Sequence, residues 1–341
     1  MQATQPSSNV RSFAYLGGIS GLALFTALIT YQGVRDVAAV LAGAGWGLAV
    51  ITAFHLTTVG AHAIAWRRLL PESDRERVAV PTLFWARWIA ESINDLLPVL
   101  QIGGNLVRAF LVQRGGMRGS VAGASVIVDV TTNVFAQLAF TLLGLCLLVF
   151  QVRHGATAAP VVFGTVIMSA MMTGFYLVQR QGIFAWLARR IERLSWTPEW
   201  TVLSANAEAL DSAVGKLYGD RAAIASAGAW HLAGWLLGAV EIWLAMMFLG
   251  HPLSLLAVVL MEALAEAVRT AAFAVPGALG VQEAGYVVVG GWLGLTPDVA
   301  LALSLAKRVR EVVLGVPGLI AWQLQGVTSV LGRKRAMEGE G

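Results

Sequence analysis

Long runs of apolar residues alternate with short polar segments along this chain of 341 residues. Six runs are long enough to cross about 30 Å of hydrocarbon as helices, which advance about 1.5 Å per residue. We expect full spans at residues 13–31, 44–66, 121–150, 157–178, 223–249 and 298–327. The pattern therefore predicts an all-α, polytopic integral membrane protein.

Two further apolar stretches, residues 82–112 and 254–295, are interrupted by proline, glycine and charged residues. Proline removes a backbone donor and disfavours helix in the residue before it, while glycine permits turns without a Cβ penalty. Basic residues are retained on the cytoplasmic side of membranes. We therefore expect the basic loops on both sides of residues 82–112 to lie in the cytoplasm. This requires the stretch between them to enter the membrane and return on the same face. We expect two re-entrant hairpins of opposite orientation beside about six full spans; the alternative is two kinked complete spans.

The same distribution of Lys and Arg places both termini in the cytoplasm. We expect a single transmembrane domain over residues 1–341, with a first half at 12–150 and a second half at 157–332. A cytoplasmic loop at 180–221 carries apolar residues at helical spacing over 183–194, beside several arginines. This segment is either a helix lying on anionic lipid or a helix packed on the inner surface of the bundle.

The two predicted hairpins share a rough sequence pattern, in which an Ala-Glu pair precedes a proline and then one or more glycines. The first contains Glu91, Pro98, Gly103, Gly104 and Arg108, and the second contains Glu266, Arg269, Pro276, Gly277, Gly280 and Glu283. Inverted repeats built from broken helices place binding sites at mid-membrane in many transporters. Broken backbone at membrane depth must be shielded from lipid. We therefore expect an inverted repeat with both hairpins in the interior.

The composition agrees with a membrane protein and excludes an ordinary soluble enzyme. Hydrophobic residues make up 57% of the chain and charged residues only 13%, with a mean hydropathy of +0.69, whereas soluble domains are about 25% charged. The net charge of +4 does not indicate nucleic-acid binding, because the basic residues share no soluble surface. Cys146 is the single cysteine, so the chain has no intramolecular disulfide and no CxxC motif.

No cofactor or metal is expected from the motifs. The sequence contains no Walker loop, no GxSxG and no HExxH. His55 and His62 lie two helical turns apart on one span, without a carboxylate or cysteine at ligand spacing. Interior polar packing is the better interpretation of both histidines.

Charged residues also occur inside or at the edges of the apolar segments. They are Arg87, Glu91, Asp95, Arg108, Asp129, Glu241, Glu262, Glu266, Arg269, Glu283, Lys307, Arg308, Arg310 and Glu311. An unpaired charge costs about 2.5 to 3.5 kcal/mol at the bilayer centre, so these side chains must face one another or water. Helical spacing allows Glu266 to pair with Arg269, and Glu311 with Lys307 or Arg308. Ion pairs that only hold the bundle together are the alternative to a binding site, but packing of small residues would do that at lower cost.

Three segments carry a resemblance that covers nearly the whole chain: residues 97–105, 124–129 and 273–283. With them the sequence resembles the lysylphosphatidylglycerol synthase transmembrane (flippase-like) family. Residues 301–308 make it most similar to the hopanoid-biosynthesis-associated HpnL branch. The resemblance implies a bacterial inner-membrane protein with a lipid-translocating fold, whose paired re-entrant elements line the site. Asn105 departs from the family pattern, in which many members have Glu after the Gly-Gly pair.

We therefore expect a lipid or hopanoid-lipid translocase without its own ATPase and without lipid aminoacylation, because no polar segment is long enough for the aminoacyl-transferring domain. Its partners would be membrane phospholipids or hopanoids and hopanoid-biosynthesis proteins. Basic side chains would meet phosphate or hydroxyl groups, and acidic ones would act as counter-charges or proton acceptors. The expected site comprises the eleven hairpin residues given above and Asp129, Lys307, Arg308 and Arg310. The alternatives are an intramembrane transferase that uses a carboxylate as general base, and a non-catalytic subunit that anchors hopanoid-synthesis proteins through residues 180–221.

Overall fold

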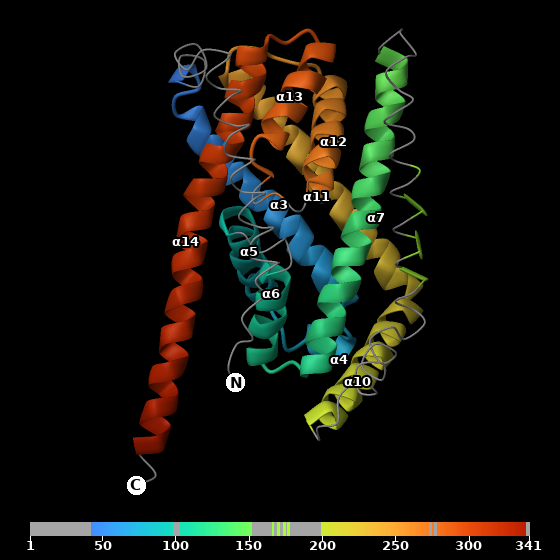
Figure 1. The fold of residues 1–341 in the computed structure, drawn as a ribbon, viewed down its shortest axis with the longest axis vertical. Coiled ribbons are helices and arrows are strands. Elements are labelled where there is room, and N and C mark those ends of the chain that lie inside the picture. Colours follow the sequence, from blue (N-terminus) through green and yellow to red (C-terminus); the bar gives the residue numbers. More distant parts are fainter. Residues whose placement is uncertain are drawn as a thin grey trace.

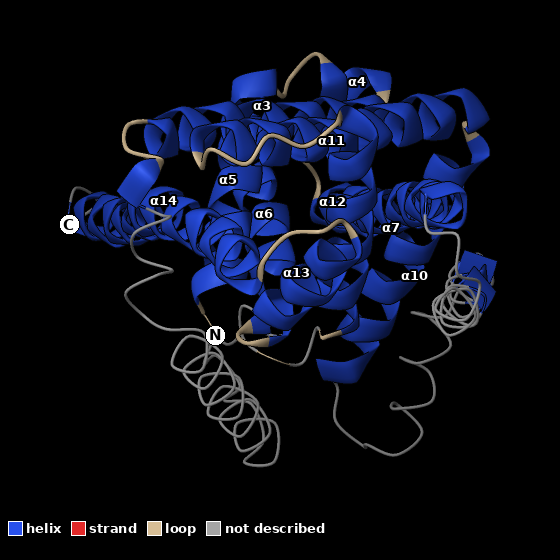
Figure 2. Cartoon of the chain, turned by 90° about the horizontal axis from the view of Figure 1, so that it is seen from above, coloured by secondary structure: helices blue, strands red, loops and turns tan. Residues whose placement is uncertain are grey.

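The computed structural model describes most of the chain as α-helix. The described residues are 42–97, 103–151, 199–272 and 278–338, with 166, 169–170, 173–174, 176–177 and 275. The helices are α3 (Gly47–Leu69), α4 (Glu72–Arg75), α5 (Val80–Leu96), α6 (Gly103–Arg114), α7 (Gly119–Gln151), α10 (Glu199–Gly219), α11 (Arg221–Phe248), α12 (Leu255–Ala271), α13 (Val281–Trp292) and α14 (Pro297–Glu338). No strand occurs among the described residues (Figure 2), so the all-α class is confirmed there.

Three of these helices are long and apolar enough to cross a membrane. They are Gly47–Leu69, Gly119–Leu148 and Arg221–Phe248, where the sequence predicted spans. The last predicted span, at 298–327, lies inside α14. The span predicted at 13–31 and about two thirds of the one at 157–178 lie outside the described residues.

The two predicted hairpins form pairs of short helices. α5 and α12 have 17 residues each, and α6 and α13 have 12 each. At 1.5 Å per residue they are about 26 Å and 18 Å long, shorter than the hydrocarbon core of about 30 Å. In Figure 1 the α5–α6 hairpin lies in the lower half of the bundle, with α4 and the start of α7 at its lower end, and α12–α13 lies in the upper half. Each hairpin thus begins and ends at one end of the bundle.

Each hairpin packs against the long helix that follows the other hairpin. α5 packs against α14 and α12 packs against α7, while α3 packs against α5 and α11 packs against α12. α3 and α11 also pack extensively against each other. α7 and α14 run in opposite directions along the bundle (Figure 1). Both hairpins are therefore enclosed by long helices.

Local sequence signals explain where several helices begin. The Asp220 side chain accepts a hydrogen bond of 2.9 Å from the Ala223 amide at the start of α11, and Ser254 caps α12 in the same way at 3.2 Å. α5 carries a proline in its first turn, where the missing donor costs nothing. Gly280 precedes α13 with φ of 76°, a left-handed conformation that favours glycine.

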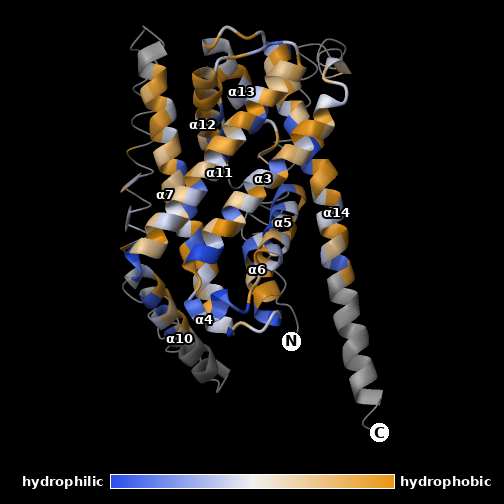
Figure 3. Cartoon of the chain, turned by 180° about the vertical axis from the view of Figure 1, so that it is seen from behind, coloured by the Kyte–Doolittle hydropathy of each residue, from blue (hydrophilic) through white to orange (hydrophobic). Residues whose placement is uncertain are grey.

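The outer surface of the bundle is apolar. On α14, Val312, Val316, Ile320 and Leu324 recur every four residues and are 45% to 60% exposed. Figure 3 shows mainly hydrophobic positions along much of α7 and α12 as well. A continuous exposed apolar stripe is unusual in a soluble monomer, whereas lipid tails cover it without cost. The surface is that of a membrane protein.

The segment predicted as a loop at 180–221 contains a helix that the sequence interpretation missed. α10 occupies Glu199–Gly219 and packs against α7 through Val214 and Leu217, which belong to a buried apolar cluster. The helix predicted over 183–194 lies outside the described residues. The sequence analysis predicted no helix over 199–219, where apolar residues cover α7.

Candidate functional site

The middle of the bundle is polar, although its long helices are apolar above and below. On α3, Ile51 belongs to one buried apolar cluster and Trp66 to another, and His55 and His62 lie between them. On α7, Asp129 is buried between corresponding apolar segments. Buried polar side chains at the same depth on neighbouring helices form a layer enclosed by hydrophobic packing.

A cavity of about 360 Å³ lies in this polar layer. Seven of the predicted site residues line it: Glu91, Arg108, Asp129, Glu266, Arg269, Lys307 and Arg310. They come from both hairpins and from the two long helices that follow them. The cavity therefore brings together residues that are far apart in the sequence.

The first buried ion cluster centres on Asp129 of α7, whose side chain is fully buried. Its carboxylate accepts hydrogen bonds from Arg108 at 2.6 Å and from Arg87 at 3.1 Å. His231 of α11 contacts the other carboxylate oxygen at 3.0 Å, and its second ring nitrogen lies 2.8 Å from His62. We call these five residues the Asp129 cluster. When both histidines are neutral, the cluster contains two cations, Arg87 and Arg108, and one carboxylate, Asp129.

The second group centres on Lys307 of α14. Its ammonium donates to Glu262 at 2.9 Å, to Glu266 at 3.0 Å and to the Tyr286 hydroxyl at 2.8 Å. Tyr286 in turn donates to Glu262 at 2.8 Å. All four side chains are buried. The ammonium thus has three partners and its neighbouring carboxylates share one cation.

Arg269 joins the two hairpins. It lies on α12 and binds Asp95 of α5 at 2.9 Å, while it also contacts Glu311 of α14 at 3.3 Å. Its predicted partner Glu266 is farther away, at 3.6 Å, because Glu266 binds Lys307 more closely. The helical spacing therefore identified a real contact but not the main partner of either residue.

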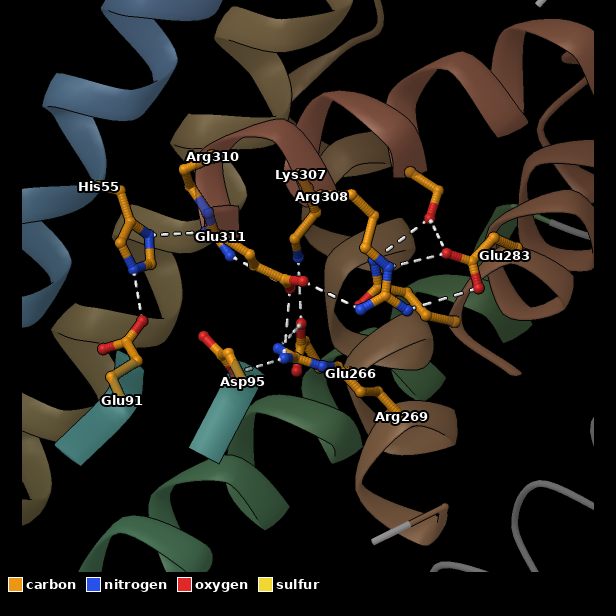
Figure 4. A network of polar contacts seen from close by, with 12 residues as sticks. His55, Glu91, Asp95, Glu266, Arg269, Glu283, Lys307, Arg308, Arg310 and Glu311 are labelled. Carbon is orange, nitrogen blue, oxygen red and sulfur yellow. Dashed lines mark hydrogen bonds and ion pairs between the residues drawn. The ribbon is translucent and has the colours of Figure 1, made fainter. Parts of the chain in front are cut away.

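Arg308 extends the same network away from the cavity. It binds Glu283 at 3.0 Å and Glu311 at 2.9 Å, and the second contact confirms one of the two pairings expected from spacing. Figure 4 shows Glu283 and Arg308 on the far side of Glu266 and Arg269 from Glu91. Glu283 and Arg308 do not line the cavity, so the structure places them beside the site as supporting ion pairs.

His55 completes the network on α3. Its Nε2 lies 2.6 Å from Glu91 and its Nδ1 lies 2.8 Å from Glu241. Arg310 binds Glu241 at 2.7 Å and approaches Glu311 at 3.6 Å. These contacts connect His55 and its two carboxylates to the ion pairs around Lys307 and Arg269. The connected set, which we call the Lys307 network, contains His55, Glu91, Asp95, Glu241, Glu262, Glu266, Arg269, Glu283, Tyr286, Lys307, Arg308, Arg310 and Glu311. It holds seven carboxylates and four permanent cations.

The two groups occupy corresponding positions in the two hairpins. Arg87 lies seven residues after the first residue of α5, and Glu262 lies seven residues after the first residue of α12. Asp129 and Lys307 each lie ten residues into the long helix that follows the hairpin. The ion pair Arg87–Asp129 thus corresponds to Glu262–Lys307 with both charges reversed.

The third member of each group follows the same rule. Arg108 lies five residues after the start of α6 and contacts Asp129, as Tyr286 lies five residues after the start of α13 and contacts Lys307. Glu91 and Glu266 each lie eleven residues into the first helix of their hairpin. These matched positions are a specific structural likeness between the two halves.

The glycines act through the backbone. Gly104 donates a hydrogen bond of 2.9 Å to Asn94, and a Cβ at this position would overlap the carbonyl oxygen of Ala90, so α5 and α6 meet only because residue 104 is glycine. Gly103 begins α6, and neither it nor Gly280 lines the cavity. Pro98, Pro276 and Gly277 lie outside the described residues.

Several residues that build the site were not among the predicted site residues. Tyr286 and His231 carry no charge signal in the sequence, and His55 was interpreted only as interior packing. The sequence analysis also identified charges at membrane depth that it did not assign to the site: Arg87, Asp95, Glu241, Glu262 and Glu311. One signal was available in the sequence, because Arg87 and Glu262 each lie four residues before the glutamate of the shared Ala-Glu pair. Arg108 and Tyr286 correspond only when the first residues of α6 and α13 are known from the structure.

Comparison with known proteins gives a match to a transmembrane region. Residues 18–318 match the sequence profile of the lysylphosphatidylglycerol synthase TM region. Searches of curated proteins and of solved structures find no significant match. Among the described residues, no group of three or more His, Cys, Asp or Glu side chains is arranged to hold a metal ion.

The Asp129 cluster yields a test of stability. Asp129→Asn leaves the buried Arg108 and the partly buried Arg87 without this carboxylate, which is expected to lower stability by about 3 to 5 kcal/mol. Adding Arg108→Gln removes one uncompensated cation and should recover part of the loss. The apparent melting temperature of the detergent-solubilised protein measures both effects. Glu76→Gln, at an exposed position, is the matched control. An Asp129→Asn protein as stable as this control would contradict the ion pairing.

Proposed function

Because the chain belongs to the lysylphosphatidylglycerol synthase TM region family, we propose that it moves the polar head groups of lipids across the bacterial inner membrane. The substrate is a phospholipid or a hopanoid lipid, as the likeness of residues 301–308 to the hopanoid-associated branch suggests. The protein works without its own ATPase. Lipid chains remain in the bilayer while the head group passes through the protein.

The observation that carries this proposal is a charged cavity at the middle of the bundle, between two hairpins that are too short to span a membrane. A cavity of about 360 Å³ is at the lower end of ligand sites, which occupy about 300 to 1,000 Å³. It accommodates a head group but not acyl chains. The apolar stripe on α14 offers the surface along which the chains would stay in lipid.

The distribution of charge supports recognition of a polar, ionic group. Arg108 lines the cavity and is buried, and its Nε–H has no hydrogen-bond partner among the described residues. An unpaired buried donor is costly, and a phosphate oxygen would satisfy it. Arg87, in the same cluster, adds a second guanidinium that lines the cavity. The Asp129 cluster is therefore the phosphate-binding side of the proposed site.

We also propose that the two halves form an inverted repeat. The matched positions of Arg87 and Glu262, of Arg108 and Tyr286, and of Asp129 and Lys307 support it, as does the opposite direction of α7 and α14. Such repeats place a site at mid-membrane and open it to either side by rocking one half against the other. In this scheme the hairpins are re-entrant and the cavity is the fixed site.

Transport can be measured directly in vesicles. Purified protein is reconstituted with fluorescently labelled phosphatidylglycerol, and the fraction of label reached by external dithionite is followed over time. Glu266→Gln should fold normally, because Lys307 keeps Glu262 and Tyr286, but should slow lipid movement about tenfold or more by altering the cavity charge. Glu76→Gln, which is exposed and away from the cavity, should behave as wild type.

The outcomes separate the competing functions. Labelled lipid that crosses only with the protein present supports translocation, whereas a new covalent lipid product would identify an intramembrane transferase. If neither activity is detected, the results favour an anchoring subunit for hopanoid-synthesis proteins. Wild-type transport in Glu266→Gln would remove this residue from the site.

The proposed orientation places the N- and C-termini and the basic loops in the cytoplasm. Cysteine is introduced at Arg77, Arg118 or His251, all exposed, in a background that lacks the exposed Cys146. A membrane-impermeant thiol reagent applied to spheroplasts should label position 251 and leave positions 77 and 118 unlabelled. Labelling at 118 but not at 77 would mean that α5 and α6 together cross the membrane completely, and the inverted repeat would be wrong.

A further inference from the structure

His55 lines the cavity and lies between two carboxylates, of which Figure 4 shows Glu91. Its Nε2 is 2.6 Å from Glu91 of α5, and its Nδ1 is 2.8 Å from Glu241 of α11. A neutral imidazole carries one N–H and serves one carboxylate only. A protonated imidazole carries two N–H groups and can donate to both carboxylates.

The surroundings of Nδ1 suit both protonation states. This nitrogen faces an acceptor, Glu241, at 2.8 Å and a donor, Nη1 of Arg310, at 2.7 Å. When His55 is neutral with a proton on Nε2, Nδ1 accepts from Arg310. When His55 is protonated, Nδ1–H donates to Glu241, while Arg310 keeps its own bond of 2.7 Å to the other oxygen of Glu241. In both states Nε2–H donates to Glu91, so a proton can be gained or lost without leaving a ring nitrogen unpaired.

The charges around His55 favour exchange of a proton. From α5 it faces Glu91, with Asp95 beside it; from α11 it faces Glu241; from α14 it faces Arg310, with Glu311 beside it. On α7 the nearest charged group, Asp129, is held by Arg87 and Arg108. The Lys307 network has seven carboxylates against four permanent cations, so one added proton reduces an existing excess of negative charge.

Glu91 is the most accessible member of this group. All three side chains line the cavity, but that of Glu91 is 32% exposed, whereas those of His55 and Glu241 are 9% and 2% exposed. Protons therefore reach His55 from the same cavity in which a head group would bind. The occupant of the cavity and the proton on His55 share one electrostatic environment.

We propose that His55, with Glu91 as its path to the cavity, binds and releases a proton in each transport cycle and so couples lipid movement to a proton gradient. This inference rests on the proposed lipid transport and adds its energy source. One proton exchanged per lipid allows a gradient of one pH unit to shift the leaflet ratio of the lipid up to tenfold.

The test uses the intact protein in vesicles that contain labelled phosphatidylglycerol and an entrapped pH-sensitive dye, with a gradient of one pH unit imposed in either direction. For wild type we expect the leaflet ratio to change several-fold with the sign of the gradient, and lipid movement to be accompanied by proton flux. His55→Gln cannot titrate and should lose both effects. His251→Gln, an exposed histidine in the loop before α12, should keep them.

Each result is decisive. Wild-type lipid movement without proton flux or gradient dependence overturns the coupling and leaves the transport function intact, even if His55→Gln fails to fold. Unchanged gradient dependence in a folded His55→Gln protein also overturns it. Absence of lipid movement in wild type refutes the proposed function, and the coupling with it.

Discussion

Charge in the interior of a membrane protein must be neutralised, and this requirement governs the structure. Side chains such as Asp129 and Lys307 lie within long helices that have exposed apolar faces, and each is buried. An unpaired charge at such a depth costs several kcal/mol, and many together would prevent insertion or folding. The pairing of cations and carboxylates from different helices therefore determines which helices must be neighbours and at which height.

The fold can be understood as the means of meeting this requirement. Short helices in hairpins bring Glu91, Asp95, Glu262, Glu266 and Arg269 to mid-depth, where the longer α3, α7, α11 and α14 supply the partners. Apolar clusters pack above and below this layer. Because the two halves place oppositely charged pairs at corresponding positions, the cavity between them has a base-rich side at Asp129 and an acid-rich side at Lys307. Such a cavity suits an ionic head group better than an apolar ligand.

Most of the helices could be predicted from the sequence, but most of the ion pairs between them could not. Uninterrupted apolar length predicted α3, α7 and α11, and Pro and Gly inside apolar stretches predicted the two hairpins. Asp129 and Lys307 stood out because a charge at membrane depth is expensive. Their partners did not, since pairs such as Asp95 with Arg269 are 174 residues apart and no local periodicity connects them. Tyr286 and His231 are ordinary residues of membrane helices until tertiary packing places them beside an ion. α10 was missed because its mixed composition resembles a polar loop.

The ion pair between Asp95 of α5 and Arg269 of α12 joins the two hairpins directly, at 2.9 Å. The most direct test of the account is a double-mutant cycle on this pair, with Asp95→Asn, Arg269→Gln and the double variant compared by apparent free energy of unfolding in detergent. We predict a favourable coupling energy of about 1.5 kcal/mol or more between the two positions. Additive effects, with a coupling energy of zero within error, would show that the hairpins do not meet through their charges.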